Sequence, residues 1–122
     1  YETMGIDRAD KEARYAWIAR NQEFFGAPAG LFCFVDRGMN QPQWSDLGMF
    51  LQTFMLLAVD AGLDTCAQES WSVYPKTVGE FCNAPDELML FCGMAIGYRD
   101  AEHPVNALRS ERNPVEEFAT FL

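Results

Sequence analysis

An apolar stretch from Trp44 to Glu69 constrains the fold of this chain more than any other feature. From Leu47 to Val59 the apolar residues are interrupted only by one glycine, one glutamine and one threonine. A helix that is hydrophobic around nearly its whole circumference is a buried helix. We therefore expect one long, buried central helix, with the rest of the chain packed around it.

Both ends of this helix carry recognisable signals. Ser45 and Asp46 suit a helix N-terminus, although Asn40 followed by Pro42 would start the helix one turn earlier. Gly62 supplies the left-handed residue that ends it. A short apolar strand, residues 63–67, is expected next.

The remaining segments predict an α+β fold in which helices pack against a sheet. Residues 7–25 show a modest helical stripe with Asp7 as the cap, and a brief helix capped by Ser72 follows the short strand. Two unbroken apolar runs, residues 29–35 and 87–98, predict strands covered on both faces.

Two glycines lie inside the second of these runs. Gly93 and Gly97 suggest that another backbone or a ligand approaches this strand closely.

Residues 99–122 differ in character from residues 1–98. They carry prolines and charges without helical or strand periodicity, and apolar side chains return at Phe118, Phe121 and Leu122. We expect residues 1–98 to belong to one domain and residues 99–122 to form an extended arm that packs on a partner subunit. Two or three strands make a thin sheet, so we also expect an incomplete domain, a dimer, or both.

Size and charge narrow the functional classes. The 122 residues fit one domain, and 49% of them are hydrophobic. The formal net charge of −9 does not resemble the basic footprint of a nucleic-acid binder. No stretch is long and apolar enough for a membrane span. The four cysteines form no CxxC pair and are expected to be buried reduced thiols, which favours a cytoplasmic location.

Side chains for acid–base, nucleophilic or metal chemistry are scarce. The chain has one histidine, His103, which its polar surroundings predict to be a solvated loop residue. No metal-ligand spacing, P-loop or dinucleotide-binding glycine motif is present. We therefore assign no catalytic side chain.

Two local features remain as candidate sites. Gln68, Glu69 and Ser70 gather polar groups at the end of the short strand, and Arg109 and Arg112 flank a hydroxyl in the arm. Arginine side chains suit phosphate oxygens. By themselves these features favour a capping turn and an exposed charge cluster over a binding site.

Taken together, four segments resemble the C-terminal half of the FMN-dependent nitroreductase family. They are GAPAGLFCFVDR, DLGMFLQTFMLLAVDAGLDTCAQESW, LFCGMAIGY and PVNALRSERNPVEEF, and they occur in the family's order through essentially the whole chain. The resemblance implies an α+β homodimer whose long central helices pack against each other, with FMN held at the dimer interface. It also implies that the C-terminal arm crosses onto the partner.

The activity implied by the resemblance is NAD(P)H-driven two-electron reduction by a ping-pong route. The acceptors would be nitroaromatics, quinones or similar small electrophiles, and the flavin would carry the chemistry. The resemblance places Gln68, Glu69 and Ser70 along the flavin, with a backbone N–H facing N5. It places Arg112 at the FMN phosphate, with Arg109 as a possible substitute for a family lysine whose position is taken by Ser110.

The family's N-terminal phosphate-binding motif has no counterpart in this sequence, and the chain starts at Tyr1 without an initiator methionine. We therefore expect a chain truncated at its N-terminus. An alternative function is a non-catalytic dimerising fragment that cannot retain FMN. Relatives that fragment flavins or dehalogenate aromatics represent a third possibility.

Overall fold

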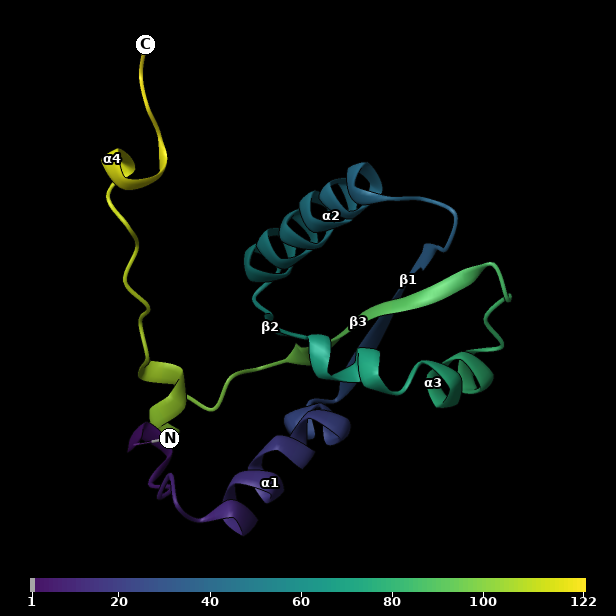
Figure 1. Cartoon of the computed structure of the whole chain (residues 1–122). Helices are drawn as coiled ribbons and strands as arrows, with labels where there is room; N and C mark the ends of the chain where they lie inside the picture. The colour runs from purple at the N-terminus through teal and green to yellow at the C-terminus, as the bar shows by residue number, and fades with distance from the viewer. Residues whose placement is uncertain (1) are drawn as a thin grey trace.

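The computed structural model describes residues 2–122, which form a three-stranded antiparallel sheet with helices on both faces (Figure 1). The strands are β1 (Ala29–Asp36), β2 (Asp64–Gln68) and β3 (Leu88–Gly97), in the order β1-β3-β2. The most continuously apolar of the three, β3, takes the centre, where it pairs with β1 along one edge and with β2 along the other. The three predicted strands are confirmed to within one or two residues.

The register of the sheet places specific residues side by side. Gly93 of β3 lies opposite Phe32 of β1 and opposite Gln68 of β2. Directly opposed residues of antiparallel strands point to the same face, so these three form one row across the sheet. A bulge between Cys33 and Phe34 shifts the pairing beyond this row.

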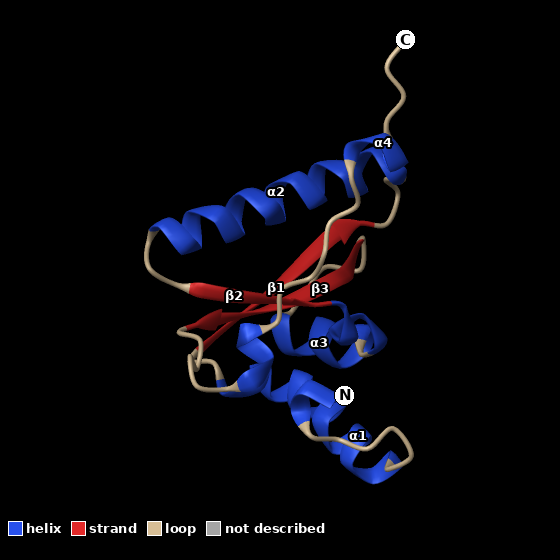
Figure 2. Cartoon of the chain, turned by 90° about the vertical axis from the view of Figure 1, so that its left-hand side faces the viewer, coloured by secondary structure: helices blue, strands red, loops and turns tan. Residues whose placement is uncertain are grey.

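The long helix α2 (Gln41–Asp60) covers one face of the sheet (Figure 2). Its N-cap is Asn40 with Pro42 in the first turn, so the earlier of the two predicted starts is confirmed. Ser45 lies inside the helix instead of at its start, where its hydroxyl donates to the Gln41 carbonyl. Gly62 adopts the predicted left-handed conformation just after the helix, with φ +78°.

Only one side of α2 is buried in this chain. Leu51 packs with Cys33, Cys92 and Met94 in a core between the helix and the sheet. The outer side exposes five large apolar side chains: Met49, Phe50, Leu56, Leu57 and Val59. The prediction of a helix buried around its whole circumference is therefore wrong for the chain by itself, because the sheet covers one side only.

The N-terminal helical region is shorter and more irregular than predicted. Helix α1 spans Lys11–Ala19, and its N-cap is Asp10, whose carboxylate accepts from the Ala13 N–H at 3.0 Å. The prediction of Asp7 as the cap is wrong, since Asp7 instead accepts from the Ala9 N–H in the preceding turn. A 3-10 segment, η2 (Arg20–Gly26), follows α1.

Two consecutive phenylalanines in η2 have left-handed backbones. Phe24 and Phe25 have φ of +50° and +55°, a conformation that is rare for bulky residues. Each such residue costs on the order of 1–3 kcal/mol and persists only where the surrounding structure holds it in place.

On the face of the sheet opposite α2 lie η2, η3 (Glu69–Val73) and α3 (Pro75–Cys82) (Figure 2). The N-cap of α3 is Tyr74, so the prediction of Ser72 as the cap is wrong; Ser72 lies within η3. Proline at the start of α3 explains the shift, because its fixed φ suits the first helical turn.

The arm after β3 leaves the sheet and runs away from it (Figure 1). It contains η4 (Pro104–Ala107) and the short α4 (Val115–Phe118), and the N-terminal η1 (Glu2–Met4) lies beside η4. Phe118, Phe121 and Leu122 are largely exposed. Within residues 2–122, no helix combines the length and apolarity needed to cross a membrane.

Candidate functional site

Gln68 is a buried polar residue at the end of β2. Its side chain is 2% exposed, and its Nε2 donates to the Asn21 carbonyl at 2.9 Å and to Asn21 Oδ1 at 3.3 Å. Its Oε1 is buried without a hydrogen-bond partner. An unsatisfied buried acceptor costs about 1–3 kcal/mol, so a donor that reached this oxygen would stabilise the turn.

Glu69 and Ser70 begin η3, directly after the strand. Ser70 is half-buried, and its hydroxyl accepts from Gln22 Nε2 at 3.5 Å. Glu69 is exposed. The turn that was predicted to line a ligand is thus tied to η2 by side-chain hydrogen bonds on both Gln68 and Ser70.

Trp71 packs as part of an aromatic cluster beneath the sheet. Its ring centroid lies 4.9 Å from those of Phe24 and Phe32, and its indole covers Gly93 so closely that a Cβ there would lie 2.3 Å from its Cδ1. The predicted close approach at Gly93 is confirmed, but the prediction that a backbone or a ligand makes it is wrong, because the approaching group is the Trp71 side chain. At Gly97 the approaching group is the ring of Pro28.

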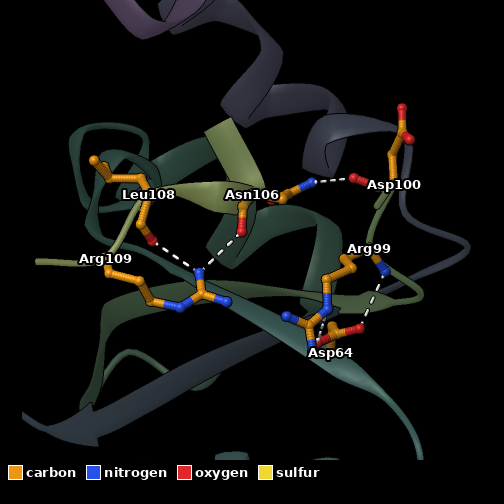
Figure 3. A network of polar contacts seen from close by, with 6 residues as sticks. All are labelled: Asp64, Arg99, Asp100, Asn106, Leu108 and Arg109. Carbon is orange, nitrogen blue, oxygen red and sulfur yellow. Dashed lines mark hydrogen bonds and ion pairs between the residues drawn. The ribbon is translucent and has the colours of Figure 1, made fainter. Parts of the chain in front are cut away.

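The two arginines of the arm lie in exposed, irregular chain. Arg109 folds back so that its Nη1 donates to the carbonyls of Asn106 at 3.0 Å and Leu108 at 2.9 Å (Figure 3). Arg112 Nη1 donates to the Ser110 hydroxyl at 2.5 Å. Both guanidiniums therefore hold local turns within this chain.

The structure does not bring the two halves of the predicted site together. Among the described residues, no hydrogen bond or ion pair joins Arg109 or Arg112 to the turn of residues 68–70. The arm instead meets the sheet through Arg99, whose Nε lies 3.1 Å from Asp64 Oδ1 (Figure 3). That ion pair holds the first residue of β2 to the residues after β3.

An open cavity of about 720 Å³ lies between η2, the start of β2 and the arm, and the sequence did not predict it. The Arg20 guanidinium lies 5.1 Å from the Trp17 ring centre and 5.8 Å from that of Phe25 on its wall. The cavity draws on residues 17–28, 64–66 and 95–106, which are distant in sequence and share no motif, so no sequence signal marked it.

His103 also lines this cavity and is not the solvated loop residue that was predicted. It is half-buried, its Nδ1 accepts from the Val105 N–H at 3.3 Å, and its ring lies 5.7 Å from that of Trp17. It caps η4, which gives it a structural role.

The cysteines are all free, but only Cys33 and Cys92 are buried; the predictions that Cys66 and Cys82 are buried are wrong. Burial, with smaller contributions from Cys33 and Glu69, raises the pKa of Cys92 to about 11. Since the thiolate is the reactive form, Cys92 is unsuited to nucleophilic chemistry near neutral pH. Within residues 2–122, no cluster of His, Cys, Asp or Glu could hold a metal ion.

The sheet, the covering helix and the polar turn match a known family along most of the chain. Residues 4–98 match the nitroreductase family model. The chain belongs to the nitroreductase family, and the predicted family and fold class are confirmed.

Individual relatives extend this match to the whole chain. The chain is 38% identical over 122 residues to a 4-nitrobenzoate reductase of Pseudomonas putida, covering 100% of this chain and 54% of that protein. It superimposes with a TM-score of 0.96 and 43% identity on an FMN and NADPH-dependent nitroreductase, NfnB, from Sphigopyxis sp. strain HMH, covering 100% of this chain and 55% of that one.

A more distant relative has the same fold. The FMN-dependent nitroreductase NfnB from Mycobacterium smegmatis, solved in complex with NADPH, is 27% identical with a TM-score of 0.94, over 100% of this chain and 55% of that one. The chain spans about half the length of the relatives it matches.

Proposed function

We propose that this chain is part of an FMN-dependent oxidoreductase in which NAD(P)H drives two-electron, ping-pong reduction of nitroaromatics, quinones or similar small acceptors. The observation that carries this proposal is the whole-chain similarity, at 43% identity, to an FMN and NADPH-dependent nitroreductase. The relative named for 4-nitrobenzoate supports a nitroaromatic as the first acceptor to test.

The residues present fit part of a flavin site. A flavin carries hydrogen-bond donors and acceptors on its ring and a dianionic phosphate, and the chain offers groups for each. Gln68 holds a buried, unpartnered oxygen at the end of β2. The backbone N–H groups at the start of η3 are the donors available to the ring, and Arg109 and Arg112 supply guanidiniums for phosphate.

Each residue then has a binding role. We assign the backbone of Glu69 and Ser70 to the flavin ring, Gln68 to a position beside it, and Arg112, assisted by Arg109, to the phosphate. The bound flavin supplies the hydride chemistry, so no side chain of this chain is assigned as acid or base.

The exposed outer side of α2 supports a homodimer as the functional form. Its five large apolar side chains form a surface that a monomer would leave in water. We propose that a second copy packs on this side, and that residues 99–122 extend over that copy. The four free thiols favour a reducing compartment, so our proposed location is the cytoplasm.

The direct test uses visible absorbance. The 122-residue chain is mixed with FMN, separated from unbound flavin, reduced anaerobically with NADPH and then given 4-nitrobenzoate. We expect a retained flavin band that bleaches with NADPH and returns with the nitroaromatic.

The contrary result is equally informative. A folded, dimeric chain that retains no flavin would overturn the proposed function for this polypeptide. It would favour a dimerising fragment, which the exposed side of α2 also supports. If FMN is retained but NADPH does not bleach its absorbance band, the flavin site stands and only the oxidoreductase assignment is contradicted.

A further inference from the structure

The four residues Asn21–Phe24 of η2 contact the turn of residues 68–71 at three separate points. The Asn21 carbonyl accepts from Gln68 Nε2 at 2.9 Å, Gln22 Nε2 donates to Ser70 Oγ at 3.5 Å, and the Phe24 ring lies 4.9 Å from that of Trp71. Within residues 2–122, every side-chain hydrogen bond found for Gln68 and Ser70 comes from this segment.

The contact between Phe24 and Trp71 is accompanied by a left-handed backbone at Phe24 and by glycines in the strands beneath the two rings. Phe24 has a left-handed backbone, with φ +50°, and its ring lies over Gly30, where a Cβ would come within 2.5 Å of it. Trp71 lies over Gly93 in the same way and packs edge-on against Phe32. Local strain that the surroundings hold in place is often found beside functional sites.

We propose that residues 21–24 and Trp71 form a clasp that fixes the turn Gln68–Ser70, making Trp71 and Gln22 positioning residues for the ligand held by that turn. The ligand is the flavin, so this inference rests on the proposed function. The clasp acts through the backbone of Glu69 and Ser70, and neither Trp71 nor Gln22 is required to touch the flavin.

A clasp of this kind has a physical reason. Backbone N–H groups bind a ligand well only when they are already oriented, because ordering a loop on binding costs free energy. The turn follows β2, a short edge strand that pairs with β3 along one edge only. The contacts from η2 supply the missing restraint on residues 68–70.

The first test needs no flavin. We would compare Trp71→Leu, Trp71→Phe and Gln22→Ala with Phe81→Ala, a matched change of an exposed aromatic residue on α3. NMR order parameters at the Glu69 and Ser70 N–H groups should fall from about 0.85 to below about 0.6 in Trp71→Leu. Gln22→Ala should lower them partly, and Trp71→Phe should restore most of the order.

The second test uses bound flavin. Trp71→Leu should raise the FMN dissociation constant on the order of tenfold, Trp71→Phe should remain within about threefold of the parent, and Phe81→Ala should not change it. The visible spectrum of bound flavin at saturation should shift in the same rank order. A residue that only stabilises the fold would lower the amount of folded protein without shifting that spectrum.

The two tests separate the clasp from the proposed function. If the parent chain retains no FMN, the proposed function fails, and the order parameters still decide the clasp. Unchanged order at Glu69 and Ser70 in folded Trp71→Leu or Gln22→Ala would overturn it, as would an equal loss of order in Phe81→Ala. Should Trp71→Leu fail to fold, Gln22→Ala, which removes a single side-chain hydrogen bond, decides the outcome.

Discussion

Glycine is required at position 93 because an indole occupies the space that a side chain would need. The sheet register sets Gly93 between Phe32 and Gln68, and Trp71 closes over it. Gly30 accommodates the Phe24 ring for the same reason. The two glycines thus allow the aromatic cluster to pack directly on the backbone of the sheet.

Gly93→Ala should therefore destabilise the fold. A Cβ 2.3 Å from Trp71 Cδ1 forces the indole away, and overpacking of this kind costs about 1–3 kcal/mol. The free energy of unfolding from urea titration measures this change. Gly48→Ala is the matched control; Gly48 lies in α2 with no atom near its Cβ position, so this change should stabilise the fold by about 0.5–1 kcal/mol. Equal effects of the two changes would contradict the packing argument.

Cys92 makes the stability depend on pH in the alkaline range. Its pKa rises from 9.0 to about 11 on folding, mainly through burial. Between these values the unfolded chain loses the thiol proton while the folded chain keeps it, so stability falls as pH rises. The whole contribution is roughly 3 kcal/mol and is complete only above the folded pKa. Cys92→Ala should flatten the plot of unfolding free energy against pH over this range, whereas Cys82→Ala, which removes an exposed thiol, should leave the slope as it is.

Arg112 is the residue that best tests the proposed phosphate contact. Charge-assisted hydrogen bonds contribute about 1.5–3 kcal/mol, so Arg112→Ala should raise the FMN dissociation constant by roughly ten- to a hundredfold. Fluorescence titration of FMN measures it. Arg8→Ala removes an equal charge from the exposed N-terminal region and should have little effect. An unchanged affinity in Arg112→Ala would remove this residue from the proposed site.

At the scale of elements, helix α2 is buried on one side and exposed on the other. Leu51 and Ala58 face the sheet and are buried, whereas Leu57 is 64% exposed. The apolar composition of both sides was plain in the sequence. The composition could not show which side of α2 is covered by the chain's own sheet, because that depends on the size and position of the sheet.

Leu57→Glu should weaken self-association. Placing a carboxylate in an apolar contact is costly because the charge loses its water, so we expect the dimer dissociation constant to rise by at least about tenfold. Sedimentation equilibrium measures it. Phe81→Glu introduces the same charge at an exposed position of α3, on the other face of the sheet, and should leave association unchanged. A parent chain that stays monomeric at all concentrations would contradict the proposed interface.

At the scale of the whole molecule, the two groups of residues that we propose for the flavin site do not meet within this chain. The turn of residues 68–70 is held against η2 beneath the sheet, while Arg109 and Arg112 lie on an arm that leaves it (Figure 1). The chain spans about half the length of its relatives. We expect the second copy, which we propose to pack on α2, to bring these pieces to one ligand.

Truncation after Arg112 tests the role of the arm. Phe118, Phe121 and Leu122 are exposed, so removing them should change the free energy of unfolding at dilute concentration by less than about 0.5 kcal/mol. The same truncation should weaken dimerisation measurably by sedimentation, because these side chains would lose their contact with the second copy. A large loss of stability in the dilute monomer would show that the arm packs on its own chain.

The sequence by itself determined where the three strands lie along the chain, the long apolar helix and its glycine stop, and membership of the nitroreductase family. These features depend on local composition and on motifs made of residues that are close together in the sequence. It also identified Gln68, Glu69 and Ser70 as a unit, because they are adjacent in the chain. The order of the strands in the sheet came from the structure.

The tertiary structure alone decided which contacts form between distant segments. The sequence assigned the cap of α1 to Asp7 although Asp10 takes it, because several acidic residues near a helix start are equally good caps and packing selects among them. It could not pair Gln68 with Asn21, or Trp71 with Phe24 and Gly93. Those pairs depend on strand register and on the left-handed turn at Phe24 and Phe25, which bulky residues adopt only when the folded surroundings hold them there.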